Sequence, residues 1–130
     1  MAQLNDKWQA LNAFWNSFSL NAYDENTVPD DAQMPYITYN GATDGWDYDV
    51  PTNASIWYRT SSWATVSQKA EEIAKAIGEN GYYITPIDGG YMVIKKGNVF
   101  AQRMNDPDDD SVRRILLSVL INYLTAYKRS

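Results

Sequence analysis

The sequence predicts a two-layer α+β domain, with two or three helices packed on a mixed, mostly antiparallel sheet of about five strands. Three observations favour this class. Two segments, near residues 4–19 and 63–77, repeat apolar residues at helical spacing. Short β-branched and aromatic runs lie between and after them, separated by Gly, Pro and Asp. With 130 residues, a single domain over 1–130 could bury roughly two thirds of its unfolded surface.

The composition is that of a globular protein without redox or imidazole chemistry. Hydrophobic residues make up 45% and charged residues 21%, while aromatic residues reach 14%. Some of the Trp and Tyr side chains belong to the core, and others are candidate interface anchors. The chain has no cysteine and no histidine, which excludes disulfides, thiol nucleophiles and imidazole acid–base catalysis. We therefore expect no enzyme activity and no cofactor.

The charge balance argues against direct binding of nucleic acid. Sixteen acidic and 11 basic residues give a net charge of -5, and no basic cluster is dense enough to follow a phosphate backbone. No run of 18 apolar residues is present, so no membrane span is expected. The N-terminus lacks the layout of a secretory signal. We expect a protein that is made and kept in a cytoplasm-like space, or in an assembly built there.

The first helix is expected between about residues 4 and 19, with Asn5 or Asp6 as its N-cap. Its apolar face repeats at spacings of four and three and comprises Leu4, Trp8, Leu11, Trp15 and Phe18, widened by Ala10 and Phe14. Residues 22–35 then form a long loop by composition. Residues 36–40 and 54–60 are expected to pair as antiparallel strands, with an acidic and aromatic loop projecting between them.

A second helix follows, and the chain then returns to strands. Ser61 or Ser62 would cap this helix and Gly78 would end it. Its apolar stripe comprises Trp63, Val66, Ala70, Ile73, Ala74 and Ile77. Residues 81–87 and 91–96 flank a tight turn and predict a hairpin, in which Pro86 lies at an open edge or a bulge.

The end of the chain combines a long connection with an ambiguous apolar segment. Residues 98–111 are expected to form a second loop. Residues 112–127 fit either a helix capped by Asp110 or Ser111, or a strand. Leu117 and Ile121 would lie on the wet side of that helix, whereas a central strand covered on both faces accommodates them. We therefore predict a closing strand.

Two acidic segments are the candidate contact sites. The first runs from Asp106 through Asp108 and Asp109 to Asp110 and could bind a hard cation, but it lacks the ligand pattern of an EF-hand loop. A solvated acidic loop that meets basic groups of a neighbouring chain is the better interpretation. The second combines Asp44, Asp47 and Asp49 with aromatic residues, a composition typical of sugar-contacting loops. Its spacing fixes no catalytic pair, and the chain is small for a hydrolase cleft.

Several phrases resemble small neck proteins of long, non-contractile-tailed bacteriophages. They are residues 22–31 (AYDENTVPDD) leading to PYITY at 35–39, ASIWYR at 54–59, DGGY at 88–91 and FAQRMNDPDD at 100–109. The resemblance covers nearly the whole chain. Such proteins are often described as minor capsid or minor structural proteins, and their size and layout are similar to tail terminators.

The resemblance implies a non-enzymatic ring component of the virion. Tail terminators are α+β subunits that form hexameric rings on the head-proximal end of the tail tube, where they end polymerisation and receive head-completion proteins. The implied partners are copies of the same chain, the tail tube protein and a head-completion or connector protein, with DNA crossing the lumen unbound. The candidate interface residues are Trp46, Asp47, Tyr48, Asp49, Arg103, Asp106, Asp108, Asp109, Asp110, Arg113 and Arg114.

Three other functions stay open on sequence grounds. Within the same class, the chain could be another head-completion, head–tail joining or minor capsid protein. Outside it, a small carbohydrate-binding module would use the loop around Trp46. A dedicated binder that inhibits a host enzyme is also compatible with the acidity and the lack of catalytic residues.

Overall fold

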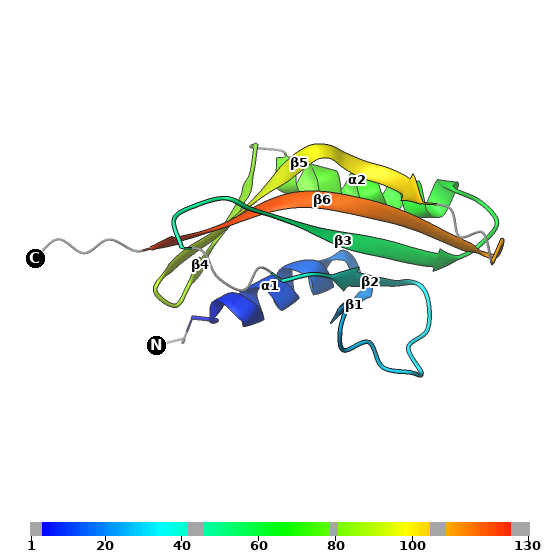
Figure 1. Ribbon diagram of the computed structural model, residues 1–130, viewed down its shortest axis with the longest axis horizontal. Coiled ribbons are helices and arrows are strands. Elements are labelled where there is room, and N and C mark those ends of the chain that lie inside the picture. Colours follow the sequence, from blue (N-terminus) through cyan, green and yellow to red (C-terminus); the bar gives the residue numbers. More distant parts are fainter. Residues whose placement is uncertain (1–3, 42–45, 79–80, 105–108, 126–130) are drawn as a thin grey trace, which may run out of the picture.

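The computed structural model describes residues 4–41, 46–78, 81–104 and 109–125. These residues form two α-helices, a short 3-10 turn and one curled six-stranded sheet (Figure 1). The strand order is β1-β2-β3-β6-β5-β4, in which only the first pair is parallel. The predicted α+β class with a mixed, mostly antiparallel sheet is confirmed, and the sheet has one strand more than expected.

The elements follow one another along the chain with few long connections. The helical elements are α1 (Lys7–Trp15), η1 (Asn16–Phe18) and α2 (Ala64–Gly78). The strands are β1 (Asn21–Asp24), β2 (Tyr36–Tyr39), β3 (Val50–Arg59), β4 (Tyr83–Ile87), β5 (Gly90–Met104) and β6 (Val112–Thr125). The strands β3, β5 and β6 run along the long axis of the molecule (Figure 1).

Two expectations about loops are wrong. Strand β1 overlaps the start of the segment 22–35 that composition assigned to a loop, because its four residues pair in parallel with β2. Strand β5 continues for 15 residues, through much of the expected connection at 98–111. Its pairing with β6 shifts register between Lys96 and Ala101. This bulge contains Gly97 and Asn98, which resemble loop residues although the strand resumes beyond them.

The closing segment is a strand, as predicted, and it lies inside the sheet between β3 and β5. Alternate residues of β6, such as Leu117 and Ile121, are buried beneath the helices. The expected cover on both faces is not found in the described residues, since the intervening Leu116 and Leu120 stay half-buried. The strand therefore has one core face and one partly open face.

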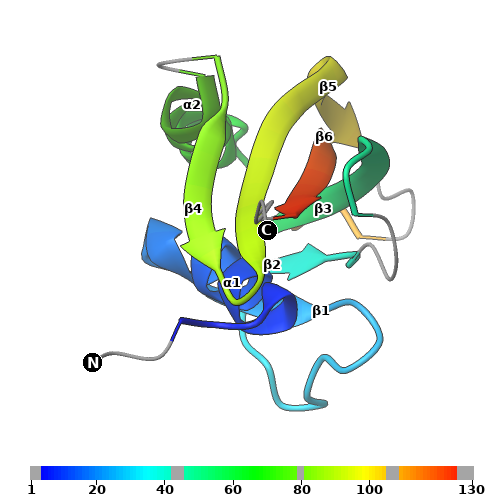
Figure 2. The same cartoon turned by 90° about the vertical axis from the view of Figure 1, so that its left-hand side faces the viewer.

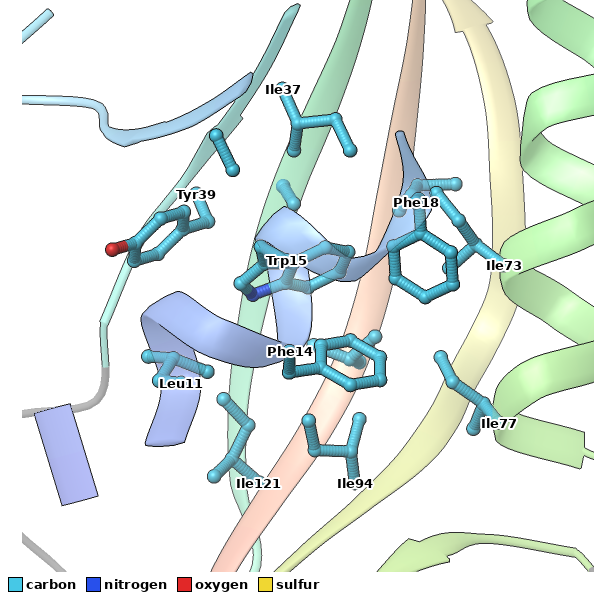
Figure 3. Close-up of a cluster of buried hydrophobic side chains, with 14 of the residues drawn as sticks. Leu11, Phe14, Trp15, Phe18, Ile37, Tyr39, Ile73, Ile77, Ile94 and Ile121 are labelled. Carbon is cyan, nitrogen blue, oxygen red and sulfur yellow. The ribbon is translucent and has the colours of Figure 1, made fainter. Parts of the chain in front are cut away.

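Both helices pack on the same side of the sheet (Figure 2). Their buried side chains meet those of the strands in one cluster, shown in Figure 3, which includes Leu11, Phe14, Trp15, Phe18, Ile37, Tyr39, Ile73, Ile77, Ile94 and Ile121. Phe14 and Trp15 contact edge to face, with ring centroids 4.9 Å apart. Such burial is the main stabilising term of the fold.

The first helix begins later than predicted, at Lys7, and most of its predicted apolar face is buried. Asp6 is the N-cap: its carboxylate accepts the Gln9 amide at 2.8 Å, and the Gln9 side chain accepts the Asp6 amide at 3.0 Å. Leu4 and Trp8, predicted on the apolar face, are 50% and 45% exposed. The other residues of the predicted apolar face are buried in the core: Ala10, Leu11, Phe14 and Trp15 in α1, and Phe18 in η1.

The second helix and the hairpin form where the sequence predicts them. The Ser62 hydroxyl accepts the amide of Ala64, the first residue of α2, and the helix extends to Gly78. Gly89 in the turn between β4 and β5 has φ of +87°, a conformation that favours glycine. Pro86 lies in β4, the edge strand of the sheet, where no ladder donor is needed on the outer side.

Candidate assembly surfaces

The predicted interface residues divide between the two ends of β6. This strand has 14 residues, so its ends lie about 43 Å apart at a rise of about 3.3 Å per residue. Segment 46–49 lies at the Thr125 end, where Asp47 bonds to Thr125. Asp109 and Asp110 immediately precede the Val112 end. The two acidic segments therefore belong to separate surfaces.

Segment 46–49 is fastened to the sheet and does not project as the loop was expected to. The Asp47 amide donates to the Tyr123 carbonyl at 2.7 Å. The Asp47 carboxylate accepts from the amide of Thr125 at 2.8 Å and from its hydroxyl at 2.7 Å. These bonds hold Asp47 at φ of 72° and lower the pKa of its carboxyl, the Thr125 hydroxyl having the larger effect.

The neighbouring side chains of this segment are also in contact with the strands. Asp49 accepts from Lys95 at 3.3 Å and from the Asn122 amide at 3.0 Å. The Trp46 ring packs on Tyr123 with centroids 6.1 Å apart, and the Lys7 ammonium lies 5.7 Å from the Trp46 ring centroid. Tyr48 presents the most exposed ring of the segment, at 53%, and Trp46 is 38% exposed.

The turn before β6 is held by an exposed polar cluster. Asp109 accepts from the Ser111 amide at 2.9 Å and lies 3.5 Å from the Arg59 guanidinium. The hydrogen bonds from Ser111, and then Arg59, lower the pKa of the Asp109 carboxyl. Asp106 and Asp108 fall outside the described residues. The part of this acidic run that the structure describes bonds largely within its own chain.

Two of the predicted arginines lie near one tryptophan. The guanidinium groups of Arg103 and Arg113 lie 5.1 and 5.5 Å from the centroid of the Trp63 ring. Arg113 also donates to the carbonyls of Asp110 at 2.7 Å and Ser61 at 3.1 Å. Arg113 therefore has a structural role, whereas Arg103 belongs to an exposed part of β5.

Arg114 lies on the opposite side of the sheet, the face that no described helix covers. It donates to the Ser55 hydroxyl at 3.0 Å, and its guanidinium lies 4.7 Å from the Trp57 ring centroid. Tyr36 and Tyr23 continue this aromatic row, at centroid separations of 6.5 and 5.8 Å. The three rings were not among the candidates. Alternation along residues 36–39 and 54–58 is the signal that separates them from the core.

A basic groove between α2 and β5 was not anticipated either. It consists of two adjoining hollows of about 340 and 330 Å³ that share Ala74. Lys75, Lys96 and Arg103 line it together with one acidic residue, Glu71. These residues come from a helix and a strand that sequence analysis treated separately, so no local pattern brings them together.

An acidic loop between β1 and β2 marks the other edge of the sheet. It hangs away from the sheet in Figure 1 and carries Glu25, Asp30 and Asp31, all exposed. An open hollow of about 370 Å³ lies between residues 30–34 and Arg59. The length of this loop was predicted, but its acidic residues were not singled out.

Metal and membrane sites were searched for in the described part of the chain. Within it, no group of three or more His, Cys, Asp or Glu side chains is placed to hold a metal ion. No helix among the described residues has the length and apolarity to cross a bilayer.

Comparison with known proteins finds likeness in structure alone. No protein-family model matches this sequence, and no curated protein matches it. A solved structure described as the virion of a native gene transfer agent particle contains a chain with a similar fold. The similarity covers 87% of this chain and 83% of that chain, with a TM-score of 0.57 and 17% sequence identity. At that identity, what the two chains share is the fold.

Proposed function

We propose that this protein is a structural subunit of a phage-like virion. The observation that carries the proposal is the fold likeness to a virion chain over most of the length of both chains. The phage neck-protein phrases at residues 22–39 and 100–109 support it independently. The function is to dock with copies of itself and with adjoining parts of the particle.

The finer proposal concerns place and stoichiometry. By resemblance to tail terminators, the subunit forms a ring of about six copies at the head-proximal end of the tail tube. The ring ends tube growth and presents a surface to a head-completion or connector protein, while DNA passes through its lumen. A closed ring requires two different faces of each subunit in contact. The two ends and two edges described above supply distinct faces.

The proposal assigns no catalytic role to any residue. The chain lacks the two side chains most used for nucleophilic and acid–base chemistry near neutral pH. Three described carboxylates in the predicted contact segments, those of Asp47, Asp49 and Asp109, bond to side chains of the same protein. This also disfavours a sugar-binding role, since Asp47 and Asp49 already accept hydrogen bonds from the protein's own side chains. A different head-completion or minor capsid role remains the alternative within the class.

The full chain tests the ring directly. Light scattering after size-exclusion chromatography and native mass spectrometry should give one closed stoichiometry near six copies, and negative-stain images should show rings. A protein that stays monomeric at every concentration, up to the millimolar range, would contradict the ring. Mass spectrometry of purified particles gives a separate readout: absence of the chain from mature particles would contradict a virion role altogether.

A further inference from the structure

The β1 edge of the sheet and the far half of β5 lie at the same level along the strand direction. One row of paired residues crosses five strands and runs from Tyr23 through Thr38, Ser55 and Leu116 to Gln102. Tyr23 belongs to β1 at one edge, and Gln102 belongs to the far half of β5 at the other. A second copy displaced along this row would bring its β1 side next to the β5 side of the first.

The β5 edge is open in this half of the sheet. Strand β4 pairs with β5 only from Gly90 to Ile94, and among the described residues no strand lies beyond β5 from Lys95 to Met104. The groove beside α2 follows this open edge. Its floor includes the apolar Ala70, Ala74 and Phe100, and its charged lining consists of three cations against one carboxylate. It is therefore an apolar and basic docking surface.

The opposite edge is acidic and does not offer a free strand. Asp24 and Glu25 lie at the end of β1, and Asp30 and Asp31 follow in the loop. The side-chain amide of Asn16 accepts from the Ala22 amide at 3.0 Å and donates to the Ala22 carbonyl at 3.4 Å. These bonds occupy the outward backbone groups in the middle of β1. Contact at this edge must therefore come from the acidic loop rather than from strand pairing.

We infer that copies of this chain associate head to tail, with the acidic loop 25–31 of one copy seated in the basic α2–β5 groove of the next. The opposite charges lie on one chain, so the complementary partner is the chain itself. Because the two surfaces lie at opposite edges, the contact is heterologous, the kind that generates rings. This inference rests on the proposed self-association and names its contact.

Charge reversal separates this contact from any other. Asp30→Lys with Asp31→Lys places like charges in the contact, as does Lys75→Glu with Lys96→Glu. Each pair should weaken assembly at least about 100-fold, since juxtaposed like charges cost several kcal/mol. A chain carrying all four substitutions restores attraction and should assemble again, as should a mixture of the two reversed proteins. Asp88→Lys, on the exposed hairpin turn, is the control and should assemble normally.

Cysteine cross-linking supplies a readout that does not depend on weakened binding. The chain has no cysteine, so introduced thiols report a single contact. Oxidation of a double variant, Ala32→Cys with Ala101→Cys, should give a ladder of covalent multimers. Neither single variant should pass the dimer.

The possible results distinguish a failure of this contact from a failure of the proposed ring. Rings that survive both reversals without change overturn this contact and leave the ring intact. Loss on groove reversal alone, with loop reversal neutral, also overturns it, because that result indicates that the groove contacts a surface other than the acidic loop. A wild-type protein that never self-associates overturns the proposed ring itself. Circular dichroism and thermal melting of each variant establish that it is folded.

Discussion

Tyr123 is fully buried near the end of β6, and in the described structure its hydroxyl has no hydrogen-bond partner. Burial raises the pKa of this phenol from 10.0 to about 12. The neutral ring is the form that the folded protein favours. The contribution of the neutral Tyr123 phenol to the free energy of unfolding is therefore fully present below pH 10 and is lost as the pH rises through 12.

This predicts an alkaline loss of stability that one substitution removes. Wild-type protein should lose roughly 2 kcal/mol of unfolding free energy through this group between neutral pH and pH 12. Tyr123→Phe should be nearly neutral at pH 7, because the hydroxyl makes no described bond, and should escape the alkaline loss. Urea unfolding at a series of pH values measures both. Tyr82→Phe, at an exposed ring, should follow the wild type.

Val99 is a second residue with a local cost. It is β-branched, 65% exposed and lies in the β5 bulge at φ of 54°. The left-handed region costs a residue with a β-carbon roughly 1–2 kcal/mol, and exposure leaves little packing to lose. Val99→Gly should therefore raise the free energy of unfolding by about 0.5–1 kcal/mol. Denaturant melts check this, with Val50→Gly, in the regular part of β3, as the substitution that should lower stability.

At the scale of the element, segment 46–49 is held against the C-terminal end of β6 by the hydrogen bonds of Asp47. The hydrogen bonds from Thr125 lower the pKa of Asp47, so this carboxylate stabilises the fold above its ordinary pKa of 3.8. The effect disappears as the pH falls through the lower, folded value.

Asp47→Asn should consequently lower stability at neutral pH and match the wild type in strong acid. Hydrogen exchange should show the change first at the amide of Thr125, which donates to the Asp47 carboxylate. Asp88→Asn, at the exposed turn of the hairpin, should alter neither observable. Equal loss in both variants would refute a specific fastening role for Asp47.

Elements with a complete local signal were predictable from the sequence. The Ser62 hydroxyl accepts from the first amide of α2, Gly78 is the last residue of that helix, and Gly89 supplies the hairpin turn. Strand β1 was not predictable, because its four residues form a strand by pairing with β2, a contact that the local sequence does not reveal. The register shift in β5 was not predicted for the same reason. Gly97 indicates a turn locally, and only the pairing with β6 shows that the strand continues.

The candidate surfaces depend still more on tertiary structure. Sequence analysis identified charged and aromatic segments, and the structure shows that Asp47 and Asp49 bond within the chain. The groove beside α2 unites Lys75 with Lys96 and Arg103, residues that no spacing relates. Which residues are free to contact a partner is settled by the fold.

At the scale of the whole molecule, the net charge of -5 predicts that the protein does not bind DNA. The protein should not slow the migration of double-stranded DNA in a gel-shift experiment at about 0.15 M salt. Under this condition, non-specific DNA binding depends on basic patches. The quadruple charge variant described above has the same net charge and is the matched control. Retention of DNA by the wild-type protein alone would contradict a lumen that DNA crosses without binding.

The single amide of Asn16 has a consequence for how far this protein can polymerise. The backbone N–H and C=O of Ala22 already bond to Asn16, so the outer edge of β1 has few free backbone groups with which to pair with another strand. The part of β5 beyond its pairing with β4 could still pair with an incoming strand. A molecule that can take a strand but not give one cannot propagate an endless cross-β ribbon. At high local concentration, the Asn16 side chain therefore disfavours fibril growth through this edge of the sheet.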